Sequence, residues 1–252
     1  MKRDRLMVLV LASLISLSVI ALLGLNASSS GRAEEGAPIL EYPEFPPTPT
    51  IGPQPAARPN PAGVLLASEN FDSPDALARW EIVDPAGLLP EDRSLWSVED
   101  GVLVQNRTAA AGDPSIQETM ALTGDPAWTD YTLSANVYDQ NNATFGLVAR
   151  RQGNSFYRYR IIADQFEATP KQILEKVVDG VATPLATRDS PGYTRRQWHT
   201  IAMSVAGPNI RVTLDGTLVA EAGDTTLSSG QAGLYTRALG GIRFDDVTVT
   251  AP

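Results

Sequence analysis

The sequence from Val64 onward predicts an all-β domain built of antiparallel strands, as in a sandwich or a barrel. Short runs rich in Val, Ile, Leu, Thr and aromatic residues are separated by Gly, Asp, Asn and Pro. Asp-Gly pairs stand at 100–101, 179–180 and 215–216, and both residues tolerate the positive φ of a tight hairpin. Apolar residues also alternate with a period of two, which places one face of a strand on a core. We expect a single domain over 64–252 without internal repeats.

One helical turn is expected at the entry to this domain, with Ser73 as its cap, Pro74 at its first position and 75–80 as its body. The expected strands span residues 64–68, 96–99, 101–105, 116–120, 131–138, 144–151, 156–162, 171–178, 181–187, 198–206, 209–214, 217–222, 230–236 and 242–249.

The hairpin expected at 144–162 has the most informative pattern. Strict alternation places one set of its side chains on the core, namely Phe145, Leu147, Ala149, Tyr157, Tyr159 and Ile161. The other set mixes arginines with an aromatic ring on the opposite face, where Arg150, Phe156, Arg158 and Arg160 would lie together.

Composition excludes several classes of function. The net charge of −9 and a pI near 4.7 argue against a nucleic-acid partner, because phosphate binding needs a basic surface. The chain has no cysteine, so it has no disulfide, no thiolate metal site and no lipid-modified N-terminal cysteine. His199 is its one histidine, which excludes most zinc sites. We interpret it as a solvated or edge residue at a strand start.

The N-terminal part predicts export. Basic residues within a cytoplasmic tip at 1–5 precede an apolar run at 6–25, which is long enough to span a bilayer as an anchor helix. This predicts a single-pass protein of the cell membrane with its C-terminal domain outside the cytoplasm. The alternative is a signal peptide, and cleavage of residues 1–27 or 1–33 would then release a secreted protein. Residues 26–63 are rich in proline and predict a disordered, extended linker.

Seven segments along the domain are NFDSPDALARW, WSVEDGVLVQ, DYTLSANVY, FGLVARRQGNSFYRYRI, EKVVDGVATPLA, WHTIAMSVAGPNIRVTLDGTLVAE and GQAGLYTRALGGIRFDDVTV. In this order, they resemble the concanavalin A-like lectin/glucanase jelly roll, in the branch with laminin G-like and DUF1080-like domains. This resemblance covers essentially all of 64–250, and it implies an antiparallel two-sheet jelly-roll sandwich. Such folds host lectins, glycosidases, adhesion modules and spacers.

Two kinds of site follow from these residues. A retaining glycosidase needs two carboxylates about 5 Å apart, and no strand has the alternating acids that catalytic jelly rolls use, so we predict no catalytic residue. The first and last strands of a jelly roll are neighbours, so Glu69, Asp72 and Asp245 could approach one another. Such carboxylates could hold a structural calcium ion, or they could simply cap turns or face water. No other cofactor is expected.

The second candidate site is the arginine face: Arg150, Arg158, Arg160 and Phe156, with Tyr138 and Trp96 as neighbours. Guanidinium groups bind carboxylate or sulfate, and aromatic rings stack on sugars. The alternative is that carboxylates on adjacent strands pair with these arginines. The leading hypothesis is a membrane-tethered module outside the cytoplasm, without catalytic residues, that binds a glycan or polysaccharide, acidic ones included. A structural or protein-interaction domain and an atypical glycoside hydrolase-like enzyme are the alternatives.

Overall fold

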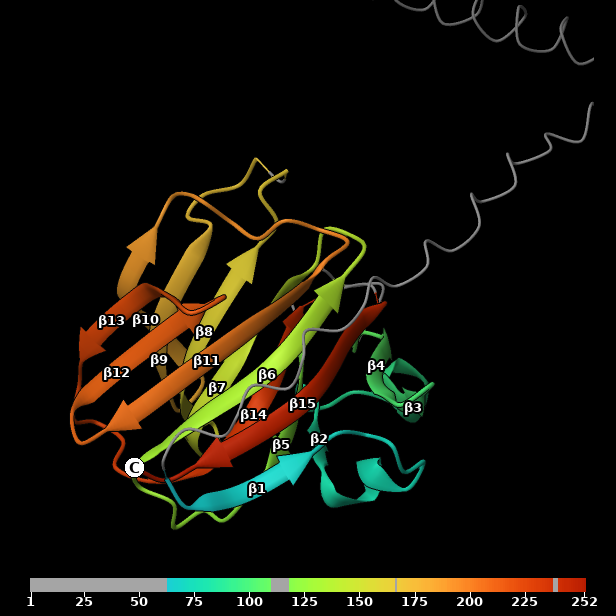
Figure 1. Cartoon of the computed structure of the whole chain (residues 1–252), viewed down its shortest axis with the longest axis horizontal. Helices are drawn as coiled ribbons and strands as arrows, with labels where there is room; N and C mark the ends of the chain where they lie inside the picture. Colours follow the sequence, from blue (N-terminus) through green and yellow to red (C-terminus); the bar gives the residue numbers. More distant parts are fainter. Residues whose placement is uncertain (1–62, 110–117, 166, 238–239) are drawn as a thin grey trace, which may run out of the picture. The chain divides into compact units, whose positions relative to one another are not determined.

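Two antiparallel sheets lie face to face in the computed structural model, which describes residues 63–109, 118–165, 167–237 and 240–252 (Figure 1). Sheet A has the order β13-β12-β11-β6-β15-β4-β3, and β1 also pairs with β15. Sheet B has the order β10-β9-β8-β7-β14-β5-β2. The strands are β1 (Leu65–Glu69), β2 (Glu81–Val83), β3 (Leu95–Glu99), β4 (Val102–Arg107), β5 (Thr119–Thr123), β6 (Tyr131–Asp139), β7 (Thr144–Gln152), β8 (Ser155–Ile162), β9 (Gln172–Val178), β10 (Val181–Arg188), β11 (Trp198–Ala206), β12 (Asn209–Leu214), β13 (Thr217–Gly223), β14 (Gln231–Arg237) and β15 (Ile242–Thr250).

Most of the predicted strands are confirmed to within a residue or two, and the exceptions lie near the start of the domain. β5 begins three residues later than predicted, and the three-residue strand β2 was not predicted. The predicted helical turn is a 3-10 helix limited to Ala76–Arg79, and no side chain caps it. Another 3-10 helix, Pro90–Asp92, follows β2.

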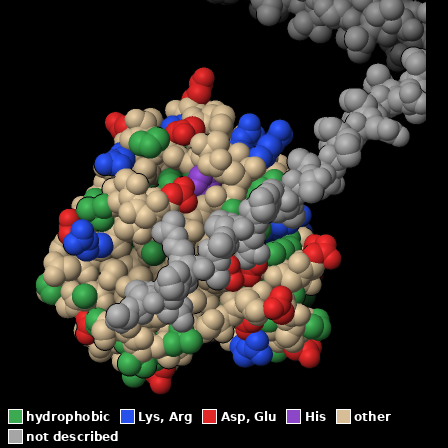
Figure 2. All heavy atoms as spheres, in the orientation of Figure 1, with side chains coloured by type: hydrophobic (Ala, Val, Ile, Leu, Met, Phe, Trp, Pro, Cys, Tyr) green, Lys and Arg blue, Asp and Glu red, His purple; other side chains and the backbone are tan. Residues whose placement is uncertain are grey.

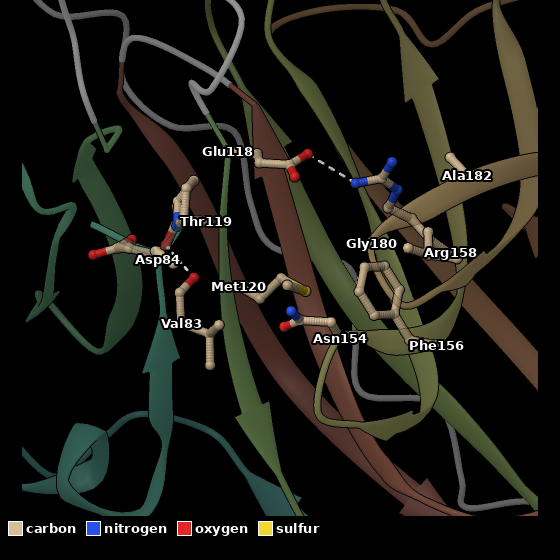
Figure 3. Close-up of a pocket in the computed structure, with 13 residues that line it drawn as sticks. Val83, Asp84, Glu118, Thr119, Met120, Asn154, Phe156, Arg158, Gly180 and Ala182 are labelled. Atoms are coloured by element: carbon tan, nitrogen blue, oxygen red, sulfur yellow. Dashed lines mark hydrogen bonds and ion pairs between the residues drawn. The ribbon is translucent and has the colours of Figure 1, made fainter. Parts of the chain in front are cut away.

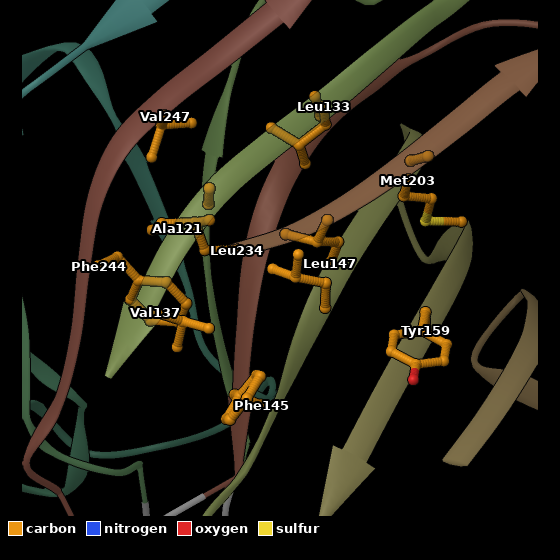
Figure 4. Packing of buried hydrophobic residues seen from close by; sticks show 14 of the residues in the cluster. Ala121, Leu133, Val137, Phe145, Leu147, Tyr159, Met203, Leu234, Phe244 and Val247 are labelled. Carbon is orange, nitrogen blue, oxygen red and sulfur yellow. The ribbon is translucent and has the colours of Figure 1, made fainter. Parts of the chain in front are cut away.

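The main core lies between the sheets and contains the predicted inward-facing residues of the β7–β8 hairpin. Phe145, Leu147 and Tyr159 are fully buried in it. Figure 4 shows these three packing against Val137 from β6 and Met203 from β11, so residues of sheet B meet residues of sheet A. Alternation along each strand therefore builds this core as predicted.

The three Asp-Gly pairs make tight turns as predicted. Asp100, Asp179 and Asp215 have φ values of 51°, 50° and 51°, and the glycine after each also has a positive φ. This backbone favours the twist of a two-residue hairpin. The pairs connect β3 to β4, β9 to β10 and β12 to β13.

Arg150 breaks the alternation of β7. The register with β8 shifts between Ala149 and Gln152, and Arg150 has a φ of 51°, so the strand bulges there. Arg150 Nε donates to the carbonyl of Thr129 at 2.8 Å, and its Nη1 donates to the carbonyl of Gly207 at 2.9 Å. Its side chain thus reaches loops at one end of the sandwich. The prediction that Arg150 shares a face with Arg158 and Arg160 is wrong, because a bulge interrupts the period of two.

Sheet B also buries residues on its outer face. Met120, Leu122, Val148, Phe156, Val177 and Tyr235 form a second hydrophobic cluster separate from the main core. Phe156 is the member of this cluster on β8, and it lies on the face of β8 that also bears Arg158, as the alternation predicts. The outer face of sheet B is therefore partly apolar and partly charged.

β15 occupies the middle of sheet A. It pairs with β6 along one edge, and along its other edge it pairs first with β4 and then with β1. The predicted proximity of the first and last strands is thus confirmed, and Phe71 and Phe244 are both fully buried in the main core. In sheet B, β14 has a similar place between β7 and β5.

Acidic and basic side chains are interspersed on the face seen in Figure 2. Within the described ranges, no helix combines the length and apolar character needed to cross a bilayer. The predicted anchor at 6–25 and nearly all of the proline-rich linker lie outside those ranges.

Candidate ligand-binding site

A pocket of about 290 Å³ opens on the outer face of sheet B (Figure 3). Its size is near the lower end of the range of about 300 to 1,000 Å³ found for small-molecule sites, so it suits one small ring. The segment after β2 forms one wall, and β8 with the β9–β10 turn forms the wall opposite it. The lining residues are Val83, Asp84, Pro85, Ala86, Glu118, Thr119, Met120, Asn154, Phe156, Arg158, Val177, Gly180 and Ala182.

Local sequence explains why these side chains meet. Phe156 and Arg158 are two residues apart on β8, so they project from the same face. Val177 pairs with Phe156 across β8 and β9. Gly180, the second residue of an Asp-Gly turn with a φ of 83°, keeps the rim beside Asn154 free of a side chain. The pairing of β8 with β9 thus forms the apolar floor of the pocket, and the glycine of the β9–β10 turn leaves its rim open.

Arg158 is the electrostatic centre of the pocket. Its Nε donates to Glu175 Oε1 at 2.8 Å, and its Nη1 donates to Glu118 Oε2 at 2.8 Å. Its guanidinium also lies 4.6 Å from the centroid of the Tyr235 ring, within cation–π range. Burial opposes the charge of Arg158, but Tyr235, Glu118 and Glu175 together raise its pKa above the ordinary value. Its charge is therefore already balanced by protein carboxylates.

Glu118 has the more accessible of these carboxylates. Its side chain is 39% exposed, whereas that of Glu175 is 2% exposed. The Tyr235 hydroxyl donates to Glu118 Oε2 at 3.0 Å, and burial raises the pKa of Tyr235 above its usual range. The tyrosine therefore stays protonated and helps to fix Glu118 at the pocket wall.

Asp84 brings a second carboxylate to the pocket from the opposite wall (Figure 3). Its Oδ2 accepts a hydrogen bond from the backbone N–H of Ser94 at 3.1 Å. Its Oδ1 is buried and has no hydrogen-bond partner among the described residues. The pocket thus combines an aromatic ring, an apolar floor and converging polar groups, which is the combination that polar, ring-shaped ligands need.

The structure divides the predicted arginine face. Phe156 and Arg158 line the pocket, and Arg160 lies beside them and shares Glu175 Oε1 through its Nε at 2.9 Å. Arg150 lies elsewhere because of the β7 bulge. Glu175 on the neighbouring strand β9 pairs with both Arg158 and Arg160, which is the alternative considered from sequence. Arg158 also pairs with Glu118, which precedes β5 and is not on a strand next to β8.

The two other aromatic residues predicted for this face belong to sheet A. Trp96 on β3 is buried in the main core, with its ring stacked 6.1 Å from that of Phe244. Tyr138 on β6 packs against Trp198, with ring centroids 5.6 Å apart. Their placement beside the arginines was wrong, because the sequence does not reveal which strands share a sheet.

The acids proposed for calcium have other contacts. The carboxylate of Glu69 binds Arg79 and accepts the N–H of Phe71. Asp72 accepts a hydrogen bond from the side chain of Asn70. Asp245 Oδ1 accepts the N–H of Asp246 at 2.7 Å. Among the residues described, no three His, Cys, Asp or Glu side chains gather in a way that could hold a metal ion.

His199 is buried, contrary to its interpretation as a solvated residue. Its side chain is 5% exposed, and its Nδ1 lies 2.7 Å from Asp215 Oδ2. Its Nε2 lies 2.7 Å from the carbonyl of Thr194. Asp215 belongs to the Asp-Gly turn between β12 and β13, so the contact of His199 with Asp215 stabilises that hairpin.

Sequence reasoning missed Asp84, Glu118 and Glu175. Asp84 follows a strand that was not predicted, and Glu118 was assigned to a strand that begins after it. Glu175 was inside a predicted strand, and its alternation with Leu174 on the core could have placed it on the arginine face.

Comparison with known proteins identifies the fold and a family. The model of a family described as the 3-keto-alpha-glucoside-1,2-lyase-like domain matches residues 67–250. No curated protein sequence matches the chain significantly.

Three solved structures illustrate the structural likeness. The carbohydrate-binding module CBM66 from Bacillus subtilis has 16% identity and a TM-score of 0.53, over 69% of this chain and 96% of that one. A Bacillus subtilis protein of unknown function with a galectin-like fold has 10% identity and a TM-score of 0.54, over 75% and 96%. A mutant of the GH43 protein BlXynB from Bacillus licheniformis has 12% identity and a TM-score of 0.52, over 73% and 39%. At these identities the likeness establishes the fold alone, and it confirms the predicted jelly-roll sandwich.

Proposed function

Because the chain belongs to the family of 3-keto-alpha-glucoside-1,2-lyase-like domains, we propose that its pocket on sheet B binds a glycoside. The observation that supports this most strongly is that one small pocket is lined by the ring of Phe156 and by the polar side chains of Asp84, Glu118, Asn154 and Arg158. A pyranose has apolar C–H faces and a rim of hydroxyls, so it can stack on an aromatic ring while its hydroxyls bond to polar side chains.

The ligand that suits this pocket is neutral. Arg158 already contacts two carboxylates, Glu118 and Glu175, so it offers no uncompensated positive charge to a uronate or sulfate. Its remaining N–H groups, the amide of Asn154 and the carboxylate of Glu118 can instead bond hydroxyl groups. The sequence suggested a glycan or polysaccharide, acidic ones included, and the charge balance of the pocket favours neutral glucosides among them.

The test is a binding titration with the full chain. Phe156→Ala removes the stacking surface, and we expect it to weaken the binding of methyl α-glucoside at least about fivefold, since aromatic contacts are worth about 1 kcal/mol beyond area burial. Leu218→Ala on β13 is the control, because Leu218 is exposed on the other sheet. Equal affinity of a folded Phe156→Ala variant would contradict the proposal. Failure of the unaltered chain to bind any glycoside tested would favour the structural or protein-interaction alternative.

A second candidate function is catalysis of the reaction in the family's name. In a 3-keto glucoside the ketone acidifies the C2 proton. A carboxylate base can then remove that proton while the C1–O bond breaks and a C1=C2 double bond forms. The protonated carboxylate can give the same proton to the departing oxygen, so that the alcohol leaves and the base is restored. Glu118 and Asp84 both line the pocket, which is the observation that favours this reading. Glu118→Gln should abolish release of the alcohol from a 3-keto-α-glucoside, and release at the unaltered rate would exclude Glu118 as the base.

We also propose that residues 6–25 tether the domain outside the cytoplasm, on the strength of the length of this apolar run. The full-length protein should then remain in the membrane fraction after an alkaline wash, with protease access only from outside. A soluble mature form that begins near residue 28 or 34 would show a cleaved signal peptide instead.

A further inference from the structure

Arginines without a carboxylate partner gather at one end of sheet A. At this end β3, β11 and β15 begin, and β4 and β6 end (Figure 1). Figure 2 shows basic side chains gathered there on the visible face, beside the histidine. Within the described ranges, the following arginines form no ion pair, and all except Arg188 lie at this end: Arg93, Arg107, Arg188, Arg195, Arg196 and Arg243.

Strand pairing places three of these arginines in a row. Arg196 donates its backbone N–H to the carbonyl of Asp139, the last residue of β6, at 2.8 Å. Asp139 pairs with Ile242 at the start of β15, and Arg243 follows it. On the far side of β15 lies β4, which ends at Arg107. Neighbouring strands lie about 4.8 Å apart, so Arg107, Arg243 and Arg196 span about 15 Å. We call these three residues the arginine row.

The carboxylates beside the arginine row have other partners. Asp139 is 1% exposed, and its Oδ2 accepts a hydrogen bond from the Tyr193 hydroxyl at 2.6 Å. Glu99 Oε1 accepts hydrogen bonds from the side chains of Ser97 and Asn106 at 2.6 and 2.8 Å. The guanidinium groups of the row therefore keep their charge without a direct carboxylate contact, on a chain whose net charge is −9.

Two members of the row are open to a ligand. Arg107 and Arg196 are exposed, and Arg243 is half-buried. Arg107 gives one of its five N–H donors to the carbonyl of Arg93 at 3.0 Å, which leaves the others available. Arg196 has a φ of 64°, a conformation that residues other than glycine rarely adopt and that is enriched at binding sites. Trp198, also half-buried, adds an aromatic ring two residues further along the chain.

We propose that the arginine row binds an acidic polysaccharide through the carboxylates of its uronic acid units. A guanidinium can hold a carboxylate by two parallel hydrogen bonds, and the ring of Trp198 can pack against a sugar. Arginines spread over four strands suit a linear polymer with a charge on successive units. Duplex DNA fits less well, because it needs a more extensive basic surface than this acidic chain has. The row lies on sheet A and the glycoside pocket on sheet B, so the two proposals are independent.

The experiment is a calorimetric titration of the full chain with polygalacturonate, with dextran as the neutral polymer and with duplex DNA. Polygalacturonate should bind and weaken as salt is added, and dextran should not bind at this site. Arg107→Gln and Arg196→Asn should each weaken binding about fivefold, which corresponds to about 1 kcal/mol. Asparagine is chosen at 196 because it tolerates a positive φ. Arg188→Gln is the matched control, since Arg188 is exposed and unpaired among the described residues but ends β10 in sheet B.

Several results would overturn the inference. Polygalacturonate might fail to bind, its affinity might survive both substitutions in the row, or Arg188→Gln might weaken it equally. Duplex DNA that binds as tightly as polygalacturonate would show a general attraction of polyanions instead. Should one of the two row variants fail to fold by circular dichroism, the other still decides the question. Both should bind methyl α-glucoside as the unaltered chain does, so the outcome leaves the glycoside pocket untouched.

Discussion

Replacing Arg158 with alanine should lower the free energy of unfolding by about 3 kcal/mol, since breaking a buried ion pair costs about 3–5 kcal/mol. Arg158 is 9% exposed and Glu175 is 2% exposed, so the variant leaves an almost fully buried carboxylate short of a partner. Arg160 still donates to Glu175 Oε1 at 2.9 Å, and we therefore expect the lower end of the range.

Arg160→Ala is the matched comparison. Its side chain is 27% exposed and contacts the same oxygen of Glu175, so its loss should cost only about 1 kcal/mol. Urea unfolding followed by circular dichroism measures both. With a slope of about 2 kcal/mol per molar urea, Arg158→Ala should lower the midpoint by about 1.5 M.

A double variant separates pairing from packing. If the cost of Arg158→Ala comes from stranding Glu175, then Arg158→Ala with Glu175→Ala should be more stable than Arg158→Ala alone. A loss below about 1 kcal/mol for Arg158→Ala, or no recovery in the double variant, would refute the reasoning. Arg158 would then contribute little to the stability of the fold, and its role would be to bind a ligand.

Three further predictions concern stability. Gly146→Ala should cost at least about 4 kcal/mol in urea unfolding, because its Cβ would lie 1.7 Å from the carbonyl oxygen of Tyr159. Gly153→Ala meets open space at a φ of 57° and should cost only about 1–2 kcal/mol; equal losses would contradict this. Burial alone would raise the pKa of Asp224, but hydrogen bonds from neighbouring side chains hold it below its ordinary value. Ionised Asp224 therefore stabilises the folded state at pH values above its pKa in the unfolded chain, and this contribution to the free energy of unfolding should be lost as pH falls below about 4. Asp224→Asn should weaken this pH dependence. Calcium and a chelator should give equal melting temperatures, because Asp245 lies in no cluster of metal ligands among the described residues; a shift removed by Asp245→Ala would revive the calcium site.

The fold was accessible from the sequence because its signals are local. Asp-Gly pairs fix tight turns from two residues, and the alternation of Tyr157, Tyr159 and Ile161 fixes a face from one strand. The three-residue strand β2 is too short to show a period, so its position was missed. The segment that follows β2 forms one wall of the candidate pocket, and it was missed together with the strand.

The candidate site was only partly accessible because it depends on partners distant in sequence. Phe156 and Arg158 could be placed on one face from β8 alone. That Glu118 pairs with Arg158 depends on how β5 and β8 are ordered in sheet B, which no strand reveals by itself. At Arg150 a bulge interrupts the alternation of β7, so the side chain does not lie on the predicted face. Nothing in the residue type of Arg150 indicates a bulge at this position.

The position of β14 and β15 has a consequence for how this domain is made. Each is the final strand of its sheet to leave the ribosome, yet each lies inside that sheet with neighbours on both sides. Until Ile242–Thr250 has been synthesised, β6 on one side and β4 and β1 on the other have no strand between them. The sandwich therefore cannot close until both strands have been synthesised, and the sheets of the incomplete chain have open edges that favour aggregation. A premature stop before residue 231 would thus leave an aggregation-prone fragment rather than a smaller working domain.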